Sequence, residues 1–309
     1  MVPRFTRVGK VKYLGWGLGY LGVVGFKVRY PTQAGTFYSG DREGLIRQIE
    51  ECFKHRLGPG YIPEVKPPRA EARKVYGVVS PHAGYMYSGP VAAHGYCRLA
   101  EDGTPGVFVI LGPNHTGLGS GVSLYPPGGV WRTPLGDVEV DREVSERIVE
   151  SSGIIDVDER GHRYEHSIEV QLPFLQYLYG SVKIVAISML LQDLETSREV
   201  GEALATALRG VDAVIIASTD LTHYEPHDMA VKKDKLVLDA ILAMDEEAMI
   251  KAVDRGVSMC GPGPVAAMIT ALKKLGSFKP RLLSHRTSGD VTGDYMAVVG
   301  YASMVFERA

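Results

Sequence analysis

The chain has 309 residues, of which 45% are hydrophobic and 23% are charged. These proportions are typical of a folded globular protein and exclude disordered, collagen-like and coiled-coil chains. The 34 basic and 36 acidic residues give a formal net charge of -2, and no long run of either sign is present. Because nucleic-acid-binding surfaces need clustered basic residues, we expect no nucleic acid partner.

Two further features bear on the location of the protein in the cell. Tyr13–Val28 is nearly uncharged, but it contains five glycines and is shorter than the about 20 apolar residues of a spanning helix, so we expect no membrane association. The cysteines are too few and too scattered to predict a disulfide framework, which favours the reducing cytoplasm. They are Cys52, Cys97 and Cys260.

Strand-like and helix-like patterns alternate from Pro31 to the end of the chain, with no internal repeat to divide them. Asp41–Arg56 is the first predicted helix, and the proline-rich segment Arg56–Arg73 is predicted to be an exposed connection. Continuous apolar runs predict strands buried on both faces at Val75–Val79, Val107–Leu111, Val182–Ile187 and Val211–Ala217. Further predicted helices are Gly89–Leu99, Asp141–Ser151, Ser167–Tyr179, Asp193–Leu208, Met229–Ala243 and Pro262–Leu275, and the last predicted strands are Arg281–His285 and Tyr295–Val305. This alternation predicts a single α/β domain in which helices cover a sheet.

Polar loops that carry a histidine directly follow three of the predicted strands. In open α/β sheets ligands bind beyond the carboxyl ends of the strands, so these loops converge if the strands are neighbours. One such histidine alone would be interpreted as a hydrogen-bonded loop residue, but several imidazoles meeting at one edge are typical of a metal site. The loops are Ser80-Pro81-His82, Gly112-Pro113-Asn114-His115 and Ser218-Thr219-Asp220-Leu221-Thr222-His223.

The segment Glu165-His166-Ser167-Ile168-Glu169 places two carboxylates around one histidine at the start of a predicted helix. One interpretation is structural, because acidic residues in a first turn complement the helix dipole. The other is functional, because ligating imidazoles usually donate their second N–H to an acceptor. In that interpretation His166 or Glu169 orients a metal ligand without binding the ion.

Cys260 precedes Gly261-Pro262-Gly263-Pro264 and an apolar helix pattern. A thiol near a helix N-terminus is expected to have a lowered pKa, and its thiolate is both a nucleophile and a soft metal ligand. The alternative is a buried, inert cysteine.

Together these motifs resemble the Memo family, whose fold is similar to that of class III extradiol dioxygenases. The resemblance covers residues 29 to 309 and leaves residues 1–28 as an N-terminal extension of open role. It implies one three-layer α/β domain with a central mixed, largely parallel sheet between helical layers. The strings that carry it are Pro31-Thr32-Gln33-Ala34-Gly35-Thr36-Phe37-Tyr38, Pro81-His82-Ala83-Gly84-Tyr85, Leu111-Gly112-Pro113-Asn114-His115, Glu165-His166-Ser167-Ile168-Glu169, Ser218-Thr219-Asp220-Leu221-Thr222-His223 and Cys260-Gly261.

The resemblance also implies a metal site at His82, His115 and Cys260, with Asp220 and His223 lining the same cleft. The dioxygenases hold iron(II) with two histidines and a carboxylate. Because Cys260 stands in the place of that carboxylate, ring cleavage is not expected and softer ions such as copper(I) are favoured, while iron(II) and zinc stay open. Prokaryotic relatives are commonly grouped with a radical-SAM protein, which implies a functional link to one.

Three hypotheses of function follow. The first is a metal-binding protein with iron- or copper-dependent redox activity, in which His223 donates or accepts a proton and Asp220 orients or charge-balances it. The second is a non-catalytic protein that binds a peptide or small molecule in the same cleft. The third is a hydrolase with Cys260 as nucleophile and His223 as base.

Overall fold

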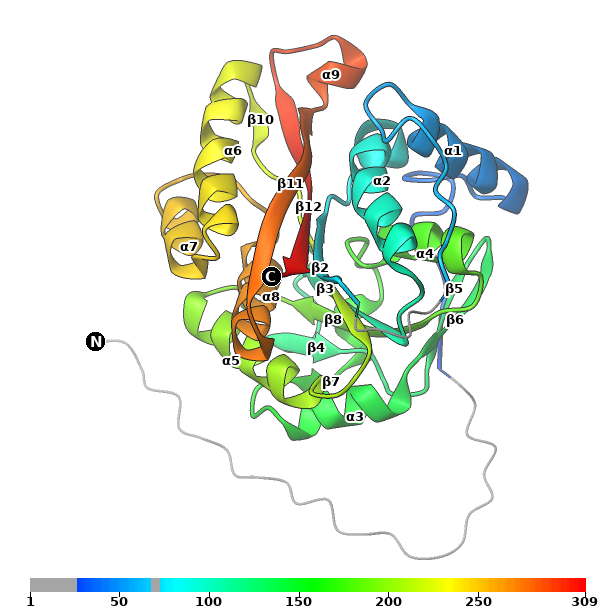
Figure 1. The fold of residues 1–309 in the computed structure, drawn as a ribbon, viewed down its shortest axis with the longest axis vertical. Helices are drawn as coiled ribbons and strands as arrows, with labels where there is room; N and C mark the ends of the chain where they lie inside the picture. The colour runs from blue at the N-terminus through cyan, green and yellow to red at the C-terminus, as the bar shows by residue number, and fades with distance from the viewer. Residues whose placement is uncertain (1–26, 68–72) are drawn as a thin grey trace, which may run out of the picture.

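The computed structural model of the protein describes residues 27–67 and 73–309. Within them, a 12-stranded sheet runs in the order β1-β5-β6-β8-β3-β9-β2-β12-β10, with β11 paired to β12 and β4 paired to β7 and β8 (Figure 1). The five central strands are parallel to one another. They are β6 (Gly136–Val140), β8 (Lys183–Met189), β3 (Val107–Pro113), β9 (Ala213–Ser218) and β2 (Val75–Ser80).

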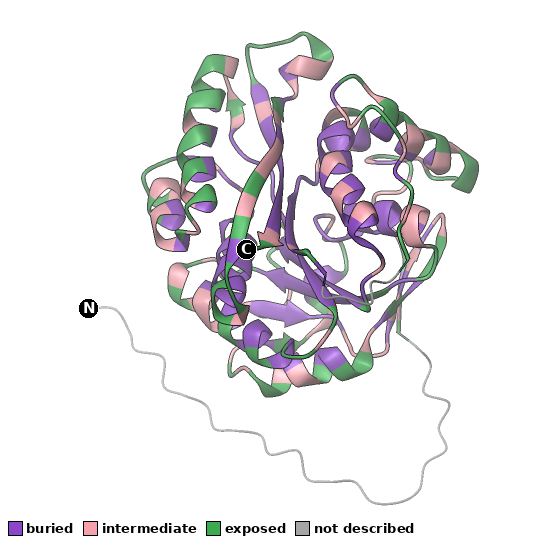
Figure 2. Cartoon of the chain, viewed as in Figure 1, coloured by how far each residue is buried: buried purple, intermediate pink, exposed green. Residues whose placement is uncertain are grey.

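The remaining strands extend this centre on both sides, and most of them are antiparallel to a neighbour. They are β1 (Val28–Arg29), β4 (Val122–Leu124), β5 (Val130–Thr133), β7 (Asp156–Val157), β10 (His223–Glu225), β11 (Phe278–Thr287) and β12 (Val298–Arg308). The sheet is therefore mixed but parallel at its centre, as predicted. β2, β3, β8 and β9 lie at the predicted positions, and β-branched and other apolar side chains make them buried on both faces (Figure 2).

Two layers of helices cover the sheet. On one face α1 (Arg42–Lys54), α2 (Tyr85–Asp102) and α4 (Leu172–Tyr179) contribute to one apolar core cluster. On the other, a second cluster includes side chains of α3 (Arg142–Glu150), α5 (Leu194–Ala207), α6 (His227–Leu242), α7 (Glu246–Asp254) and α8 (Pro262–Leu275). A short α9 spans Gly289–Thr292, and 3-10 turns span Glu159–His162 and Glu169–Gln171. The predicted three-layer α/β fold is confirmed.

Several predicted boundaries differ from those in the structure. The helix predicted over Ser167–Tyr179 begins only at Leu172, because a 3-10 turn occupies Glu169–Gln171. The helix predicted over Gly89–Leu99 begins earlier, at Tyr85, and continues through Pro90. The strands between residues 122 and 140 and helix α7 were not predicted at all.

Part of the sequence interpretation falls outside the described residues. Tyr13–Val28 and the predicted extension over residues 1–28 lie in the segment 1–26 except for their last two residues, so both stay predictions over that segment, while Val28 begins β1. The described part of the connection before β2 contains no helix or strand between residues 57 and 67. Among the helices of the described residues, none is both long and apolar enough to cross a membrane.

Candidate metal centre

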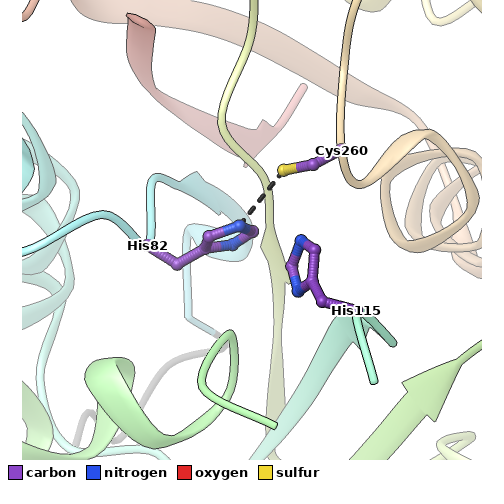
Figure 3. A group of neighbouring side chains, drawn as sticks. All are labelled: His82, His115 and Cys260. Carbon is purple, nitrogen blue, oxygen red and sulfur yellow. Dashed lines mark hydrogen bonds between the residues drawn. The ribbon is translucent and has the colours of Figure 1, made fainter. Parts of the chain in front are cut away.

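The predicted convergence of the polar loops is present. β3, β9 and β2 are adjacent and parallel, so their carboxyl ends open at one edge of the sheet. His82 follows β2, His115 follows β3, and Cys260 lies just before α8. One side-chain ligand atom from each of the three residues lies within 4.8 Å of the other two (Figure 3). Two imidazoles and a sulfur, distant in the chain, therefore meet at one point.

Hydrogen bonds beneath His82 assign the proton on its ring. Nδ1 lies 2.8 Å from Oγ of Ser218, and this hydroxyl donates to the carbonyl of Ser167 at 2.8 Å. Oγ of Ser218 also accepts an N–H from Nε2 of Gln171, and the same Gln171 amide donates to the carbonyl of Pro81. Since the single hydroxyl proton of Ser218 is already used, Nδ1 of His82 is the donor and Nε2 carries the lone pair.

Burial favours the neutral form of this imidazole. His82 is only 2% exposed, and burial, with added repulsion from neighbouring histidines, holds its pKa well below the usual value. Nε2 points at Sγ of Cys260, 3.1 Å away. A neutral imidazole with an unprotonated nitrogen directed at a sulfur is suited to binding a metal ion.

His115 is oriented by the buried carboxylate of Glu165. Its Nδ1 donates to Glu165 Oε1 at 2.9 Å, which leaves Nε2 for a metal ion. The carboxylate also accepts the backbone N–H groups of His115, His166 and Ser167. Burial by itself would raise the pKa of Glu165, but these hydrogen bonds and the adjacent histidines lower it to about 2.

His115, Glu165 and His166 also lie close enough together to hold a cation. However, the Glu165 carboxylate already accepts four hydrogen bonds, three of them at Oε1 and one at Oε2. The His166 ring stacks on His115 with centroids 4.6 Å apart and meets the His82 ring edge-on at 5.3 Å. This second group therefore supports the imidazoles of the first.

Cys260 is held against the loop that follows β9. Its Sγ accepts the backbone N–H of Asp220 at 3.0 Å, and the N–H of Gly261 donates to Oγ1 of Thr219 at 3.0 Å. Burial, together with the charge of Asp220, raises the pKa of the Cys260 thiol. The lowered pKa expected from the nearby helix N-terminus is therefore wrong, because desolvation outweighs it.

Asp220 and His223 line the same cleft as His82 and His115. Oδ1 of Asp220 accepts the backbone N–H of His82 at 2.8 Å, and burial raises the pKa of the Asp220 carboxyl to about 7. Burial lowers the pKa of His223. The imidazole that contacts the Cys260 sulfur, at 3.1 Å, belongs to His82, whereas the hydrolase hypothesis names His223 as the base.

The cleft has a volume of about 450 Å³. Its polar lining comes from Thr36, His82, His115, His166, Asp220 and His223. Its apolar and aromatic lining comes from Phe37, Met86, Tyr87, Tyr224, Val299 and Tyr301. Two of the candidate metal ligands, His82 and His115, thus line a cavity large enough for a small organic ligand.

Glu169 lies apart from this group. Its carboxylate binds Nη1 of Arg29 at 2.7 Å and Oη of Tyr38 at 2.6 Å, and it accepts the backbone N–H groups of Thr32 and Gln33. The carboxylate that contacts a candidate metal ligand is Glu165, the other acidic residue of the same motif. The sequence motifs contain both Glu165 and Ser218, but neither was assigned a role, and the only signal of Ser218 is its place at the end of a strand.

Comparison with known proteins agrees with this architecture. The sequence model of a family described as Memo-like protein matches residues 29–305. The chain belongs to the Memo family. It is 55% identical over 284 residues to a MEMO1 family protein of Methanopyrus kandleri, covering 91% of this chain and 99% of that protein. A MEMO1 family protein of Methanothermobacter thermautotrophicus is 52% identical over 280 residues, covering 90% and 99%.

Among solved structures, an uncharacterized protein of Escherichia coli K12 superposes on the Memo fold of this chain with a TM-score of 0.51. The match covers 76% of this chain and 100% of that one, at 13% sequence identity. At this identity the match supports the fold, while function has to be argued from the site itself.

Proposed function

We propose that this Memo-family protein binds one metal ion through Nε2 of His82, Nε2 of His115 and Sγ of Cys260. The observation that carries the proposal is the close approach of these three donors, which come from separate loops. The 3.1 Å between His82 Nε2 and Cys260 Sγ is compatible with two ligands of one ion at bond lengths of about 2.0–2.3 Å. Ser218 and Glu165 support the two imidazoles, as the outer partners of metal-binding histidines do.

The donor set favours a transition metal over a hard cation. Imidazole suits iron, copper and zinc, and thiolate adds a preference for softer ions, so iron(II) and copper are the leading candidates, with zinc as the alternative. When bound, iron or copper would supply one-electron redox chemistry at the cleft. The residues that line the cleft would bind the ligand and donate protons to it or accept protons from it.

His223 and Asp220 are the proposed proton-handling groups. His223 lines the cleft, and burial keeps its imidazole neutral, so it can accept a proton from a bound ligand. Asp220 connects His82 to Cys260, since its carboxylate accepts the backbone N–H of His82 and its own N–H donates to Cys260 Sγ. It therefore orients the donors and balances charge beside them.

Anaerobic titration of tag-free protein with iron(II), copper(I) and zinc tests this proposal. We expect one ion per chain, and we expect Cys260→Ser to weaken copper(I) binding by at least about 100-fold, because a hydroxyl is a poor ligand for a soft ion. Cys97→Ser is the matched control, since Cys97 is buried in α2. Absence of a stoichiometric ion, or equal copper(I) affinity in the two serine variants, would refute the proposal.

The apolar lining of the cleft favours a second candidate, a binding protein that retains a small molecule or peptide without turning it over. This candidate predicts no oxygen consumption by the metal-loaded protein. It also predicts ligand affinity that survives His82→Ala and His115→Ala, whereas the redox proposal requires both imidazoles.

A further inference from the structure

Tyr224 interrupts the pairing of β10 with β12. His223 pairs with Val299 and Glu225 pairs with the adjacent Val298, so Tyr224 is an extra residue on its strand. Its φ of 59° lies in the left-handed region, which side chains other than glycine and asparagine adopt at a cost in free energy. The strand therefore contains a β-bulge with a strained tyrosine at its centre.

The bulge changes which side chains face the cleft. In a regular strand, neighbouring residues point to opposite faces of the sheet. Here the successive residues His223 and Tyr224 both line the cleft, and their rings meet edge-on at 5.8 Å. β10 lies beside the start of β12, at the upper margin of the sheet in Figure 1. The strained backbone thus adds an aromatic wall next to the proposed proton acceptor.

The Tyr224 ring contributes little to the core of the protein. Its residue is 77% exposed, and Met86, which lines the same cleft from the start of α2, is 63% exposed. Strained conformations persist where the surrounding structure enforces them, and they cluster at ligand-binding positions. The Tyr224 ring gains little stabilisation from packing against the rest of the chain. Contact with a ligand is therefore the interaction that compensates for the cost of its backbone conformation.

The charges of the residues that line the cleft restrict the class of ligand that it binds. Among the described residues that line the cleft, none is a lysine or an arginine, and the acidic one is Asp220. Sites for phosphates and carboxylates supply cationic side chains to pair with the anion. Burying an unpaired anion beside aromatic walls is unfavourable.

We propose that Tyr224 is a specificity-determining wall of this cleft, and that the ligand is an uncharged molecule whose flat apolar part lies against Tyr224 and Met86. Its polar end then faces His223 and the metal centre. The position of the polar end of the ligand rests on the proposed function, because it assumes the metal ion. The contact with Tyr224 and the rejection of anions by the metal-free protein follow from the lining of the cleft alone.

Benzyl alcohol and benzoate, a neutral and an anionic ligand of the same shape, test the proposal by ligand-observed NMR. We expect the full chain, treated with a chelator, to bind benzyl alcohol at least about tenfold more tightly than benzoate. Tyr224→Ala should weaken benzyl alcohol binding by about fivefold through loss of the ring, whereas Tyr224→Phe should stay within about twofold. Tyr61→Ala, which removes an exposed ring outside the cleft lining, is the matched control.

Measurements on metal-loaded and chelator-treated protein, with metal content determined on the same samples, separate the two proposals. Preference for benzyl alcohol in chelated protein with no stoichiometric metal binding would refute the metal site alone. Benzoate binding as tightly as benzyl alcohol in chelated protein, unchanged binding in Tyr224→Ala, or no binding of benzyl alcohol up to its solubility would overturn this inference. An unchanged urea-unfolding midpoint in Tyr224→Ala is also expected, because the ring is mostly exposed.

Discussion

Glu165 holds both the side chain and the backbone of His115. Its Oε1 accepts Nδ1–H of the imidazole at 2.9 Å, and its Oε2 accepts the backbone N–H of the same residue at 2.6 Å. The carboxylate is fully buried and comes from a loop 50 positions further along the chain. The direction of the His115 Nε2 lone pair is therefore set by one distant acidic residue.

Replacing that residue should weaken the metal site without removing a ligand. Glu165→Gln keeps the shape but loses the charge that holds the His115 imidazole in one tautomer. We expect metal affinity to fall by about 10- to 100-fold, as is typical when the outer partner of a ligating histidine is changed. Competition with a chromogenic chelator measures this. Glu195→Gln, on the first turn of α5, is the control, and equal losses in the two variants would contradict the assigned role.

The ion pair between Arg29 and Glu169 should be the main interaction that stabilises residues 27–67, the first segment that the structure describes. Arg29 is 5% exposed, bonds the Glu169 carboxylate at 2.7 Å and lies over the Trp131 ring at 4.2 Å. Arg29→Met leaves a buried carboxylate without its cation, so the free energy of unfolding should fall by about 3–5 kcal/mol. Adding Glu169→Gln should recover part of the loss. Urea unfolding of the two single variants and the double variant measures the coupling, and strictly additive losses would show that the pair is not coupled.

The centre of the fold could be predicted because its signals are local. Continuous apolar runs identify β2, β3, β8 and β9, and the polar residues that directly follow β2 and β3 place His82 and His115 at one edge of the sheet. The short strands β4, β5 and β6 escaped prediction because three to five residues with mixed polarity and intervening glycines resemble loops. Helix α7 does carry a signal, since Asp245 caps it by accepting the N–H of Ala248, and this signal was overlooked.

The support of the site could not be predicted in the same way. Both Glu165 and Glu169 flank His166 in sequence, but Glu165 turns to His115 while Glu169 turns to Arg29. The sequence of the motif does not indicate which of the two carboxylates contacts a candidate metal ligand. The partners lie 50 and 140 positions away, and their positions follow from how the loops pack. Sequence patterns together with the family resemblance therefore pointed to the three candidate donors, and the structure was needed to find what orients them.

Gly261 should be intolerant of any side chain, because it lies between Cys260 and the start of α8. A Cβ at this position would meet the Ser218 carbonyl oxygen at 2.4 Å and the Thr219 Cβ at 2.8 Å, so the backbone next to Cys260 would have to shift. We expect Gly261→Ala to lower the free energy of unfolding by about 1–3 kcal/mol and to weaken metal binding. Thermal unfolding and metal titration measure both effects.

The matched control for this substitution is Gly153→Ala. There the nearest atom to an added Cβ is Glu199 Oε1 at 3.6 Å, which is an ordinary contact. The control should keep its metal affinity and change stability by less than about 1 kcal/mol. Wild-type metal affinity in Gly261→Ala would show that the position of Cys260 tolerates the shift, and the tight packing would then not matter for the site.

His162 should make the protein less stable as the pH falls. It is fully buried, its Nε2 hydrogen-bonds the Ser123 carbonyl at 2.9 Å, and burial lowers its pKa to about 3. The unfolded chain, with an ordinary histidine pKa of about 6.5, binds this proton more readily between about pH 3 and 6.5. The stabilisation of the fold by neutral His162 is therefore complete above about pH 6.5 and is lost as the pH falls toward 3, at up to about 1.4 kcal/mol per pH unit.

His162→Gln removes this titration and keeps an N–H that can reach the Ser123 carbonyl. The variant should be less stable than the wild type near pH 7, and its stability should fall less steeply with acid. Urea unfolding of both proteins between about pH 7 and 5, with metal chelated in both, gives the two slopes and cancels the contribution of the other titrating groups. Parallel slopes would mean that His162 takes up a proton in the folded protein as easily as in the unfolded chain, contrary to its buried position.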